Sequence, residues 1–370
     1  MTTKKRLVLV IPYLHAGGMG RVMAILASYF AGKPYMEVHI VLYGINRDIF
    51  YSLPFNVKVH KPDFRFVNTA GMRIISSIRT LLYLRRTITS LKPDSVLSLG
   101  EYWNSFVLLA LLRCKVRVFV SDRCQPDKYL GFVHERLRKW LYPRTAGIVV
   151  QTAVAETHYR QHIRHINIRV IGNPIREIEN LKKINKDNIV LTVGRLIKTK
   201  HHDQLISMFM RISKPGWKLV IVGDEVKKHS NLQQIRRRIQ ELKAEDSVIL
   251  AGQRLNVEDY YNQSRIFAFT SSSEGLPNVV GEAQSAGLPV VAFDCVSGPA
   301  ELIRDGENGF LVPLFDYESF QRRLEQLMDD AALRDQLGAA ARQSVQQFSI
   351  EKTGAAFEAF IFPELHTHEK

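Results

Sequence analysis

The stretch SSSEGLPNVVGEAQSAGLPVVA, residues 271–292, carries two glutamates eight positions apart around a Gly-Leu-Pro turn. Glu274 follows the apolar run RIFAFT, which predicts a strand, so we expect it in the loop at the carboxyl end of that strand. A helix is expected from near Asn278, because Pro277 suits a first helical turn and a second Gly-Leu-Pro ends the segment. Glu282 then lies one turn into that helix. Open α/β sheets bind ligands at the carboxyl ends of their strands, so both carboxylates are candidate site residues.

The same alternation of apolar runs and amphipathic segments continues through both halves of the chain. It is typical of parallel sheets covered by helices. The expected strands are 6–12, 38–43, 95–99, 116–121 and 147–151 in the first half and 188–193, 218–223, 248–251, 265–270, 289–293 and 310–312 in the second. The sequence therefore predicts an α/β protein with two Rossmann-like domains.

A chain of 370 residues favours two domains over a single core. The polar stretch GNPIREIENLKKINKDN, residues 172–188, is the expected interdomain linker. We therefore place an N-terminal domain at 1–175 and a C-terminal domain at 176–350. Residues 351–370 are expected to form a C-terminal helix, ending near Phe362, and a tail that can pack back on the N-terminal domain.

The composition is that of a cytoplasmic protein. Hydrophobic residues make up 46% and charged residues 24% of the chain, which is ordinary for a soluble fold. The three cysteines show no CxxC spacing, so neither a disulfide framework nor a structural zinc site is expected. No signal peptide is visible, and no apolar stretch approaches the roughly 20 residues that span a bilayer.

The positive charge is confined to the first half. Residues 1–170 hold 26 Lys and Arg against 9 Asp and Glu, whereas the net charge of the whole chain is +15. This asymmetry indicates that the first half faces an anionic partner: lipid head groups, a pyrophosphate or nucleic acid. The alternative is a set of basic helices whose charges are simply solvated.

A glycine loop follows the first expected strand in the segment PYLHAGGMGRV. Gly17 and Gly18 allow the backbone to approach a ligand closely, and the helix N-terminus behind them favours an anion. A tight turn that needs glycine explains the pair equally well. The dinucleotide fingerprint G-x-G-x-x-G is not met, because Met23 stands at the last glycine position. This disfavours a nicotinamide-dependent oxidoreductase.

Two cations follow the expected strand at 188–193 in the segment VGRLIKTKHHDQLI. Arg195 offers a guanidinium fork and Lys200 a point charge, and together they suit a diphosphate. The chain contains no Asp-x-Asp motif that would hold a metal against a diphosphate. We therefore expect a site that needs no metal and no other cofactor. His201 and His202, which lack carboxylate partners, are expected at the surface.

Three motifs in this order resemble glycosyltransferase family 4: G-R-L-x3-K, E-G-L-P-x4-E-A and G-P-x-E-L-I-x-D-G-x-N-G-x-L-V-P. Members of that family are retaining enzymes that use nucleotide sugars and have the GT-B fold, in which two Rossmann-like domains with parallel sheets face each other across a cleft. The resemblance covers nearly the whole chain, and it is more specific in the C-terminal half.

The resemblance implies a donor site. Glu282 would hydrogen-bond the ribose, and Glu274 would lie near the donor sugar. Arg195 and Lys200 match the residues that neutralise the departing diphosphate, which is electrostatic stabilisation of a leaving group. The segment AGQRLNVEDYY matches the one whose backbone touches the base. The implied nucleotide-sugar site comprises Gly17, Gly18, Arg195, Lys200, Arg254, Leu255, Glu274, Gly275, Leu276, Pro277, Asn278 and Glu282.

The first domain departs from the family pattern in the segment VFVSDRCQPDKY. Many relatives carry a histidine near the reacting sugar where this chain has Arg123, preceded by Asp122, and some relatives have a Ser-acidic-Arg version. Asp122 either accepts a proton from the acceptor hydroxyl or pairs with Arg123. The predicted catalytic residues are thus Glu274, Arg195, Lys200, Asp122 and Arg123.

The segment KYLGFVHERLRKWLYPRTAG resembles the basic helix of family members that extend polyprenyl-diphosphate-linked oligosaccharides, in which cations hold the pyrophosphate. The segment at 72–92 is also apolar, with Arg79 and Arg86 on one face. Two such helices favour peripheral attachment to the inner face of the cell membrane; the alternative is a solvent-facing basic helix of a Rossmann domain. The expected acceptor-binding residues are Glu101, Asn104, Lys128, Arg136, Arg138 and Lys139.

The resemblance predicts a bacterial enzyme that moves a hexose or N-acetylhexosamine from a UDP-sugar to a saccharide acceptor, expected to be lipid-linked, with retained configuration. A GT-B nucleotide-sugar epimerase or hydrolase is the first alternative. A basic nucleic-acid-binding protein is the second, although no helix-turn-helix, zinc-finger or RNA-recognition signature is present.

Overall fold

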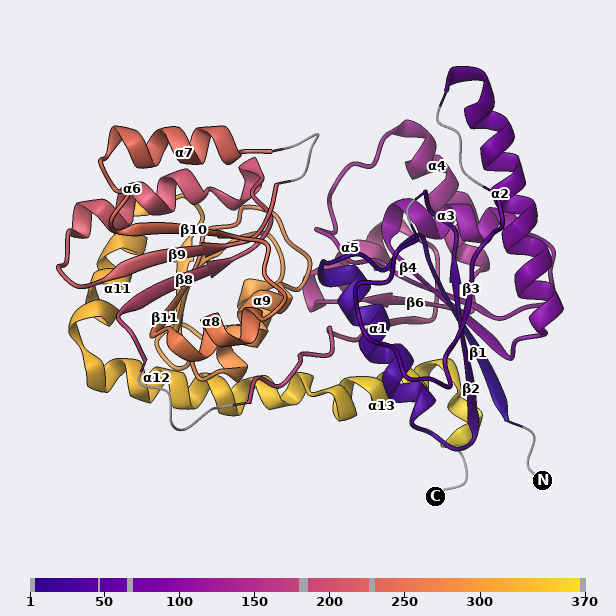
Figure 1. The fold of residues 1–370 in the computed structure, drawn as a ribbon. Coiled ribbons are helices and arrows are strands. Elements are labelled where there is room, and N and C mark those ends of the chain that lie inside the picture. Colours follow the sequence, from indigo (N-terminus) through magenta and orange to yellow (C-terminus); the bar gives the residue numbers. More distant parts are fainter. Residues whose placement is uncertain (1–3, 46, 65–68, 180–185, 226–229, 367–370) are drawn as a thin grey trace. The chain divides into compact units, whose positions relative to one another are not determined.

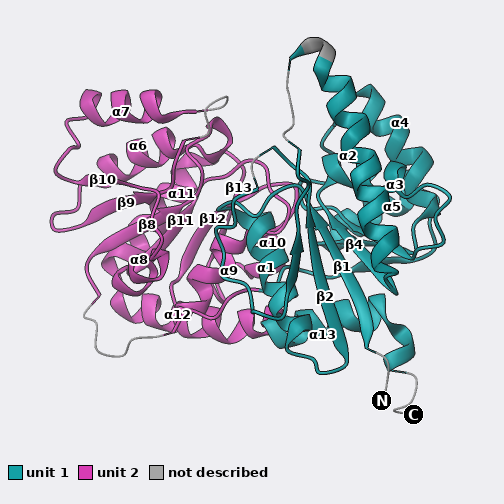
Figure 2. Cartoon of the chain, turned by 45° about the vertical axis from the view of Figure 1, so that its right-hand side comes forward, with its two compact units in different colours: residues 1–174, 350–370 teal, residues 175–349 magenta. Residues whose placement is uncertain are grey.

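The computed structural model describes residues 4–45, 47–64, 69–179, 186–225 and 230–366. The chain forms two compact units (Figure 2): unit 1 comprises residues 1–174 together with 350–370, and unit 2 comprises 175–349. The domain boundaries expected from the sequence were 175 and 350. Each unit is an α/β domain built on its own parallel sheet (Figure 1).

Unit 1 contains a seven-stranded sheet in the order β3-β2-β1-β4-β5-β6-β7, and every described pair is parallel. Its strands are β1 (Lys5–Ile11), β2 (Met36–Leu42), β3 (Lys58–His60), β4 (Ser95–Leu99), β5 (Val118–Ser121), β6 (Gly147–Val150) and β7 (Ile168–Val170). Its α-helices are α1 (Gly18–Ala31), α2 (Ala70–Leu91), α3 (Glu101–Ala110), α4 (Phe132–Leu141), α5 (Ala153–His162) and α13 (Ile350–Ile361).

The β1 strand shows why this sheet is covered on both faces. Leu7, Leu9 and Ile11 enter one apolar cluster, and the alternate residues Val8 and Val10 enter another. All five are fully buried, so the strand reads as a continuous apolar run instead of an alternating one. The expected strands of this half are confirmed, but β3 and β7 were missed, since each has only three residues and is partly polar.

Unit 2 contains a six-stranded parallel sheet in the order β10-β9-β8-β11-β12-β13. Its strands are β8 (Ile189–Val193), β9 (Lys218–Val222), β10 (Val248–Gly252), β11 (Ile266–Phe269), β12 (Val290–Asp294) and β13 (Phe310–Pro313). Its α-helices are α6 (His202–Ile212), α7 (Leu232–Glu241), α8 (Val257–Gln263), α9 (Asn278–Ser285), α10 (Pro299–Leu302), α11 (Tyr317–Asp329) and α12 (Ala331–Ser344). All six strands predicted for this half are confirmed.

Both sheets reverse their strand order once. In unit 1 the chain runs outward from β1 to β3 and returns to β4 on the other side of β1. In unit 2 it runs outward from β8 to β10 and returns to β11 beside β8. The loops at the carboxyl ends diverge where the order reverses, and open α/β sheets bind ligands there.

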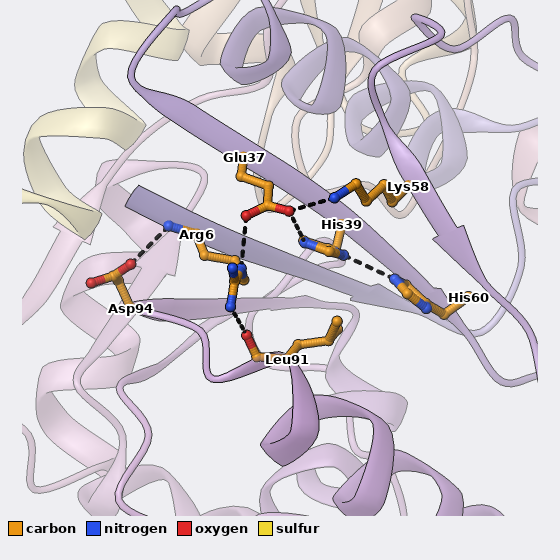
Figure 3. Close-up of polar contacts among 7 residues, drawn as sticks. All are labelled: Arg6, Glu37, His39, Lys58, His60, Leu91 and Asp94. Carbon is orange, nitrogen blue, oxygen red and sulfur yellow. Dashed lines mark hydrogen bonds and ion pairs between the residues drawn. The ribbon is translucent and has the colours of Figure 1, made fainter. Parts of the chain in front are cut away.

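A charged cluster joins three neighbouring strands of unit 1 (Figure 3). Glu37 on β2 accepts hydrogen bonds from Arg6 on β1 at 2.9 Å and from Lys58 on β3 at 2.6 Å. The hydrogen bond from Lys58, followed by those with Arg6, lowers the pKa of Glu37 to about 2. His39 Nδ1 lies 2.9 Å from His60 Nε2 beside this pair. The cluster ties the short edge strand β3 to the rest of the sheet.

The expected linker is only partly a linker. Ile175 donates its backbone N–H to the carbonyl of Phe348, and Ile178 is fully buried in an apolar cluster of unit 2. The start of the stretch at 172–188 therefore packs into unit 2, and its residues 180–185 lie outside the described residues. Across the described ranges, no helix combines the length and apolar character needed to cross a bilayer.

Candidate active site

The loops that follow β8 and β11 meet at the reversal point of unit 2. The β8 loop supplies Gly194 and Arg195 and continues through a short 3-10 turn, Lys198–Lys200, into α6. The β11 loop supplies Thr270 to Glu274. The structure thus brings Lys200 and Glu274 together, and Arg195 lies exposed on the same edge of the sheet.

Lys200 is held in place on several sides. Its Nζ lies 2.5 Å from Glu274 Oε1, and the two side chains are only 13% and 18% exposed. Its ammonium also lies 4.9 Å from the centre of the Phe269 ring, while its backbone carbonyl accepts a 2.7 Å hydrogen bond from Thr270. A Cβ on Gly194 would lie 3.4 Å from Lys200 Cε, so the side chain runs across that glycine. The cation is therefore positioned before any ligand arrives.

The turn that carries Lys200 is bound to the β11 loop through Ser272 and His201, neither of which the sequence predicts as a site residue. Ser272 donates its backbone N–H to the Thr199 carbonyl at 2.9 Å, and its hydroxyl lies 2.9 Å from His201 Nε2. His201 has a left-handed backbone, with φ at 50°, and its ring packs edge-on against Phe315. A non-glycine residue in this conformation costs free energy, so neighbouring contacts must hold it there.

His202 corrects one expectation. It was placed at the surface, but its side chain is 1% exposed, because it occupies the first position of α6 under the Lys200 turn. Burial lowers its pKa to about 3, and the nearby Lys200 acts in the same direction. A doublet of adjacent histidines gives no indication of which one faces the core.

Glu282 lies where the sequence placed it, on α9, and the predicted helix start at Asn278 is confirmed. The carboxylate is 1% exposed, and its Oε2 accepts a 3.1 Å hydrogen bond from the hydroxyl of Tyr261 on α8. Tyr261 was not predicted as a site residue. Its position in the VEDYY segment of the expected base-contacting region was the only indication in the sequence.

Two glycine loops interlock beside Glu274. Gly298, at φ 103°, approaches the Gly275 loop so closely that a Cβ would lie 1.9 Å from the Gly275 carbonyl oxygen and 2.7 Å from Pro277 Cδ. Gly275, Leu276 and Pro277 are buried, and Asn278 is half-buried at the helix start. The E-G-L-P motif and the start of the G-P-x-E-L-I motif at Gly298 therefore pack directly against each other. Arg254 and Leu255 lie in an exposed loop after β10.

In unit 1, the glycine loop precedes α1, which begins at Gly18. Gly17 has φ at 151° and is exposed. The Tyr51 hydroxyl accepts a hydrogen bond from the backbone N–H of Gly17 at 2.8 Å and donates one to the carbonyl of Gly17 at 2.9 Å. Tyr51 thus fixes the loop conformation, and nothing in the sequence pattern identified it.

Asp122 lies at the end of β5 in a buried hydrogen-bond network. Its carboxylate accepts hydrogen bonds from Asn104 Nδ2 and the Tyr142 hydroxyl, both at 2.7 Å, and from the Tyr159 hydroxyl. Burial raises the pKa of Asp122 to about 6, although the charge of Arg138 opposes this. Asn104, expected at the acceptor, is itself fully buried. Asp122 and Asn104 are therefore held within one network with Tyr142 and Tyr159.

Arg123 points elsewhere and forms no ion pair with Asp122 in the described part of the chain. Its Nη1 donates to Asn173 Oδ1, and its guanidinium lies 5.5 Å from the centre of the Phe357 ring. The remaining Nε and Nη2 are buried with no hydrogen-bond partner among the described residues, and burial lowers the pKa of Arg123 to about 9. Glu101 accepts a long, 3.4 Å hydrogen bond from the Arg123 backbone N–H.

The basic residues on and before α4 divide into two groups. Lys128, Arg136 and Lys139 are exposed, as an acceptor-binding role requires. Arg138 is buried, with its guanidinium 5.1 Å from the ring centre of Tyr159, and it offsets the charge of Asp122. The expectation that Arg138 is presented with the other three is corrected, because it lies on the inner face of the helix.

Possible metal ligands do not gather anywhere in the described ranges: no group of three His, Cys, Asp or Glu side chains has the geometry to hold an ion.

Comparison with known proteins identifies the family. The sequence pattern of the family "Glycosyl transferases group 1" matches residues 175–344. The amylovoran biosynthesis glycosyltransferase AmsD of Erwinia amylovora is 30% identical over 358 residues, which cover 94% of this chain and 96% of that protein. The chain belongs to this glycosyltransferase family. The matched span of the enzyme contains the Lys200–Glu274 pair, Glu282 and both glycine loops.

Two further similarities bear on the enzyme. The N-acetylgalactosamine-N,N'-diacetylbacillosaminyl-diphospho-undecaprenol 4-alpha-N-acetylgalactosaminyltransferase of Campylobacter jejuni is 28% identical over 367 residues, covering 93% of this chain and 96% of that one. The crystal structure of Anabaena HepE in complex with UDP and glucose superposes with a TM-score of 0.77 at 16% identity, covering 95% and 98% of the two chains. The glycosyltransferase has the GT-B fold.

Proposed function

We propose that the enzyme transfers a hexose or N-acetylhexosamine from a UDP-sugar to a saccharide carried on a polyprenyl diphosphate, with retention of configuration and without a metal ion. The observation that carries the proposal is the Lys200 ammonium, held by Glu274 at the reversal point of unit 2, with Arg195 exposed on the same edge of the sheet. Two permanent cations there provide the charge that a departing UDP requires.

In the proposed reaction the bond between the sugar C1 and the phosphate oxygen of UDP breaks while the acceptor oxygen bonds to C1 on the same face. The acceptor proton passes to the departing phosphate oxygen, so UDP leaves with the electron pair of the broken bond. Lys200 and Arg195 stabilise the charge that develops on the diphosphate. This charge exists mainly in the transition state, so the two cations should act on turnover more than on binding.

The donor assignment draws on relatives of similar fold. HepE was solved with UDP and glucose, and the Campylobacter jejuni relative is named for transfer of N-acetylgalactosamine to a saccharide on diphospho-undecaprenol. In this enzyme Glu282 would bind the ribose, with Tyr261 orienting its carboxylate. Arg123 would use its Nε and Nη2 N–H groups, which have no partner among the described residues, for a hydroxyl or phosphate oxygen of a ligand, since buried donors without partners are rare unless a ligand completes them.

The acceptor assignment rests on unit 1. Lys128, Arg136 and Lys139 present exposed cations that suit a pyrophosphate. On α2, Ile74, which is 69% exposed, and Ile78 join the exposed Arg79 and Arg86. Apolar side chains mixed with cations on one helix favour an anionic membrane surface, where the lipid part of the acceptor resides. These features support the proposal that the enzyme acts at the inner face of the cell membrane.

The donor is tested first by thermal unfolding with UDP, GDP and ADP. A ligand at about a hundred times its Kd adds roughly 2.7 kcal/mol to the unfolding free energy, which shifts Tm by several degrees. We expect a shift with UDP. UDP-sugars are then incubated with short polyprenyl-diphosphate-linked saccharides, and NMR of the product reports its anomeric configuration. A shift with GDP or ADP alone would change the donor, and release of free sugar at full rate without acceptor would favour an epimerase or hydrolase.

A further inference from the structure

Four aromatic side chains gather where the sheet of unit 1 reverses its strand order. Tyr13 and His15 follow β1, Tyr43 follows β2, and Trp103 lies in the first turn of α3, directly after β4. These strands are neighbours in the order β2-β1-β4 (Figure 1), so the side chains meet at one edge of the sheet although the sequence spreads them over 90 residues. We call Tyr13, His15, Tyr43 and Trp103 the aromatic platform.

The rings of the platform have defined orientations. Tyr13 stacks on His15 with 4.8 Å between ring centres, and Trp103 stands edge-on to Tyr13 at 6.5 Å and to Tyr43 at 6.3 Å. Gly100 makes room for this arrangement, because a Cβ there would lie 3.1 Å from Trp103 Cδ1. Trp103 nevertheless remains 37% exposed. A large apolar ring is thus fixed at the edge of the sheet without being covered.

The platform also contains buried polar atoms that its packing does not explain. His15 Nε2 and the Tyr43 hydroxyl are inaccessible to solvent and have no hydrogen-bond partner among the described residues. Such atoms lower stability, and phenylalanine would fill the same space at Tyr43 without this disadvantage. Polar atoms beside an exposed ring indicate that the platform is built for a ligand with both apolar faces and polar groups.

We propose that the aromatic platform binds a sugar ring of the acceptor saccharide. A pyranose presents C–H bonds on its faces, which pack on aromatic rings, and hydroxyls at its rim, which the partly exposed indole of Trp103 and phenol of Tyr13 can hydrogen-bond. An isoprenoid chain has no polar rim, and the exposed aliphatic side chains Ile74 and Ile78 on α2 suit it better. The proposal names the part of the acceptor that unit 1 recognises and therefore rests on the proposed function.

Saturation-transfer NMR tests the platform without any donor. The probes are the methyl α-glycosides of glucose, galactose, N-acetylglucosamine and N-acetylgalactosamine, with farnesol as the lipid probe. We expect at least one glycoside to receive saturation from the full chain. In Trp103→Ala that signal falls about tenfold, and Trp103→Phe, which keeps a ring, restores part of it. Tyr13→Ala gives a second loss if Trp103→Ala folds poorly, as judged by circular dichroism.

Phe55→Ala is the matched control, since Phe55 is a fully exposed aromatic residue of the same unit that precedes β3. Its signal should equal that of the unsubstituted enzyme. The platform proposal is overturned if no glycoside receives saturation, if the signal survives both Trp103→Ala and Tyr13→Ala, or if farnesol alone depends on Trp103. Failure of the donor proposal is separable, because the UDP-dependent shift of Tm reports on unit 2 and not on glycoside binding.

Discussion

The ammonium of Lys200 and the carboxylate of Glu274 lie 2.5 Å apart, although 74 residues separate them in the chain. Both follow strands that are adjacent in the sheet of unit 2, and this adjacency alone brings them together. The pair is mostly shielded from solvent, so its charges interact more strongly than a surface pair would. Glu274 keeps the cation in position, and in the proposed function the diphosphate of the donor supplies a second anion.

Replacement of Lys200 by alanine should lower kcat by about a hundredfold to a thousandfold, as expected when a preorganised charge is removed from a transition state. The Tm should fall only by the small amount expected from loss of the Lys200–Glu274 ion pair. Steady-state kinetics with the UDP-sugar measure the effect. Lys198→Ala is the control, because Lys198 is exposed on the same 3-10 turn, and it should retain activity. Equal activity in the two variants would exclude a leaving-group role for Lys200.

Replacement of Glu282 should weaken nucleotide binding. Loss of a hydrogen bond from ribose to a charged carboxylate should raise the Kd of UDP about tenfold to a hundredfold, as measured by calorimetry with Glu282→Ala. Tyr261→Phe removes only the residue that orients the carboxylate and should have a smaller effect. Glu258→Ala, on the exposed side of α8, is the control. If the Kd of UDP is unchanged in Glu282→Ala, Glu282 does not bind the ribose.

Gly298→Ala should disrupt the packing between the Gly275 and Gly298 loops. Its Cβ would lie 1.9 Å from the Gly275 carbonyl oxygen, so one loop must move, and overpacking of this kind costs about 1–3 kcal/mol in addition to the cost of positive φ. Gly306→Ala is a matched control, because Gly306 also has positive φ, at 75°, but a Cβ there meets nothing within 4 Å. Urea unfolding should show a larger loss for Gly298→Ala, and UDP affinity should fall in that variant alone. Equal losses of unfolding free energy in the two variants would mean that the close approach of Gly298 to the Gly275 carbonyl does not matter for stability.

Acidification should destabilise unit 2 through His202. Its pKa is lowered from 6.5 to about 3 in the folded state, so below pH 6.5 the unfolded chain binds a proton that the folded chain does not. The contribution of the neutral histidine is complete above pH 6.5 and is lost as the pH falls toward 3. The unfolding free energy, measured at pH 7.5 and pH 5, should therefore decrease less in His202→Gln than in the unsubstituted enzyme. His162→Gln, at an exposed position, should behave like the unsubstituted enzyme.

Transfer should continue in the presence of EDTA, because in the proposed mechanism Arg195 and Lys200 supply the charge that a divalent ion supplies elsewhere. The rate is measured after dialysis against EDTA and again after Mg²⁺ or Mn²⁺ is restored. Unchanged rates are expected. Inactivation by EDTA that either metal reverses would contradict the proposed chemistry.

The sequence predicted the parts of the site that lie close together along the chain. The start of α9 at Asn278 and the position of Glu282 one turn later follow from local rules: a proline before the helix and a glycine after it. The long apolar strands were predictable from local pattern in the same way. The edge strands β3 and β7 were not predictable, because three partly polar residues carry no periodic pattern.

Residues whose role depends on distant partners were not predictable. Tyr51 binds the Gly17 backbone, and Ser272 binds His201 and Thr199, through contacts that span tens of residues. His202 and Arg138 were misplaced, because each belongs to a short polar run in which the buried member cannot be distinguished from its neighbours.

The sequence by itself determined the order of strands and helices, the division into two α/β domains and the family. It did so through periodicity, turn residues and motif spacing, which act within short stretches of chain. Only the tertiary structure decided that Lys200 meets Glu274, that Asp122 is enclosed by Asn104 and two tyrosines, and that four aromatic residues converge at one edge of the sheet. The physical reason is that strand order in a sheet is set by packing between distant segments, and it is this order that places the ends of β8 and β11, or of β1 and β4, side by side.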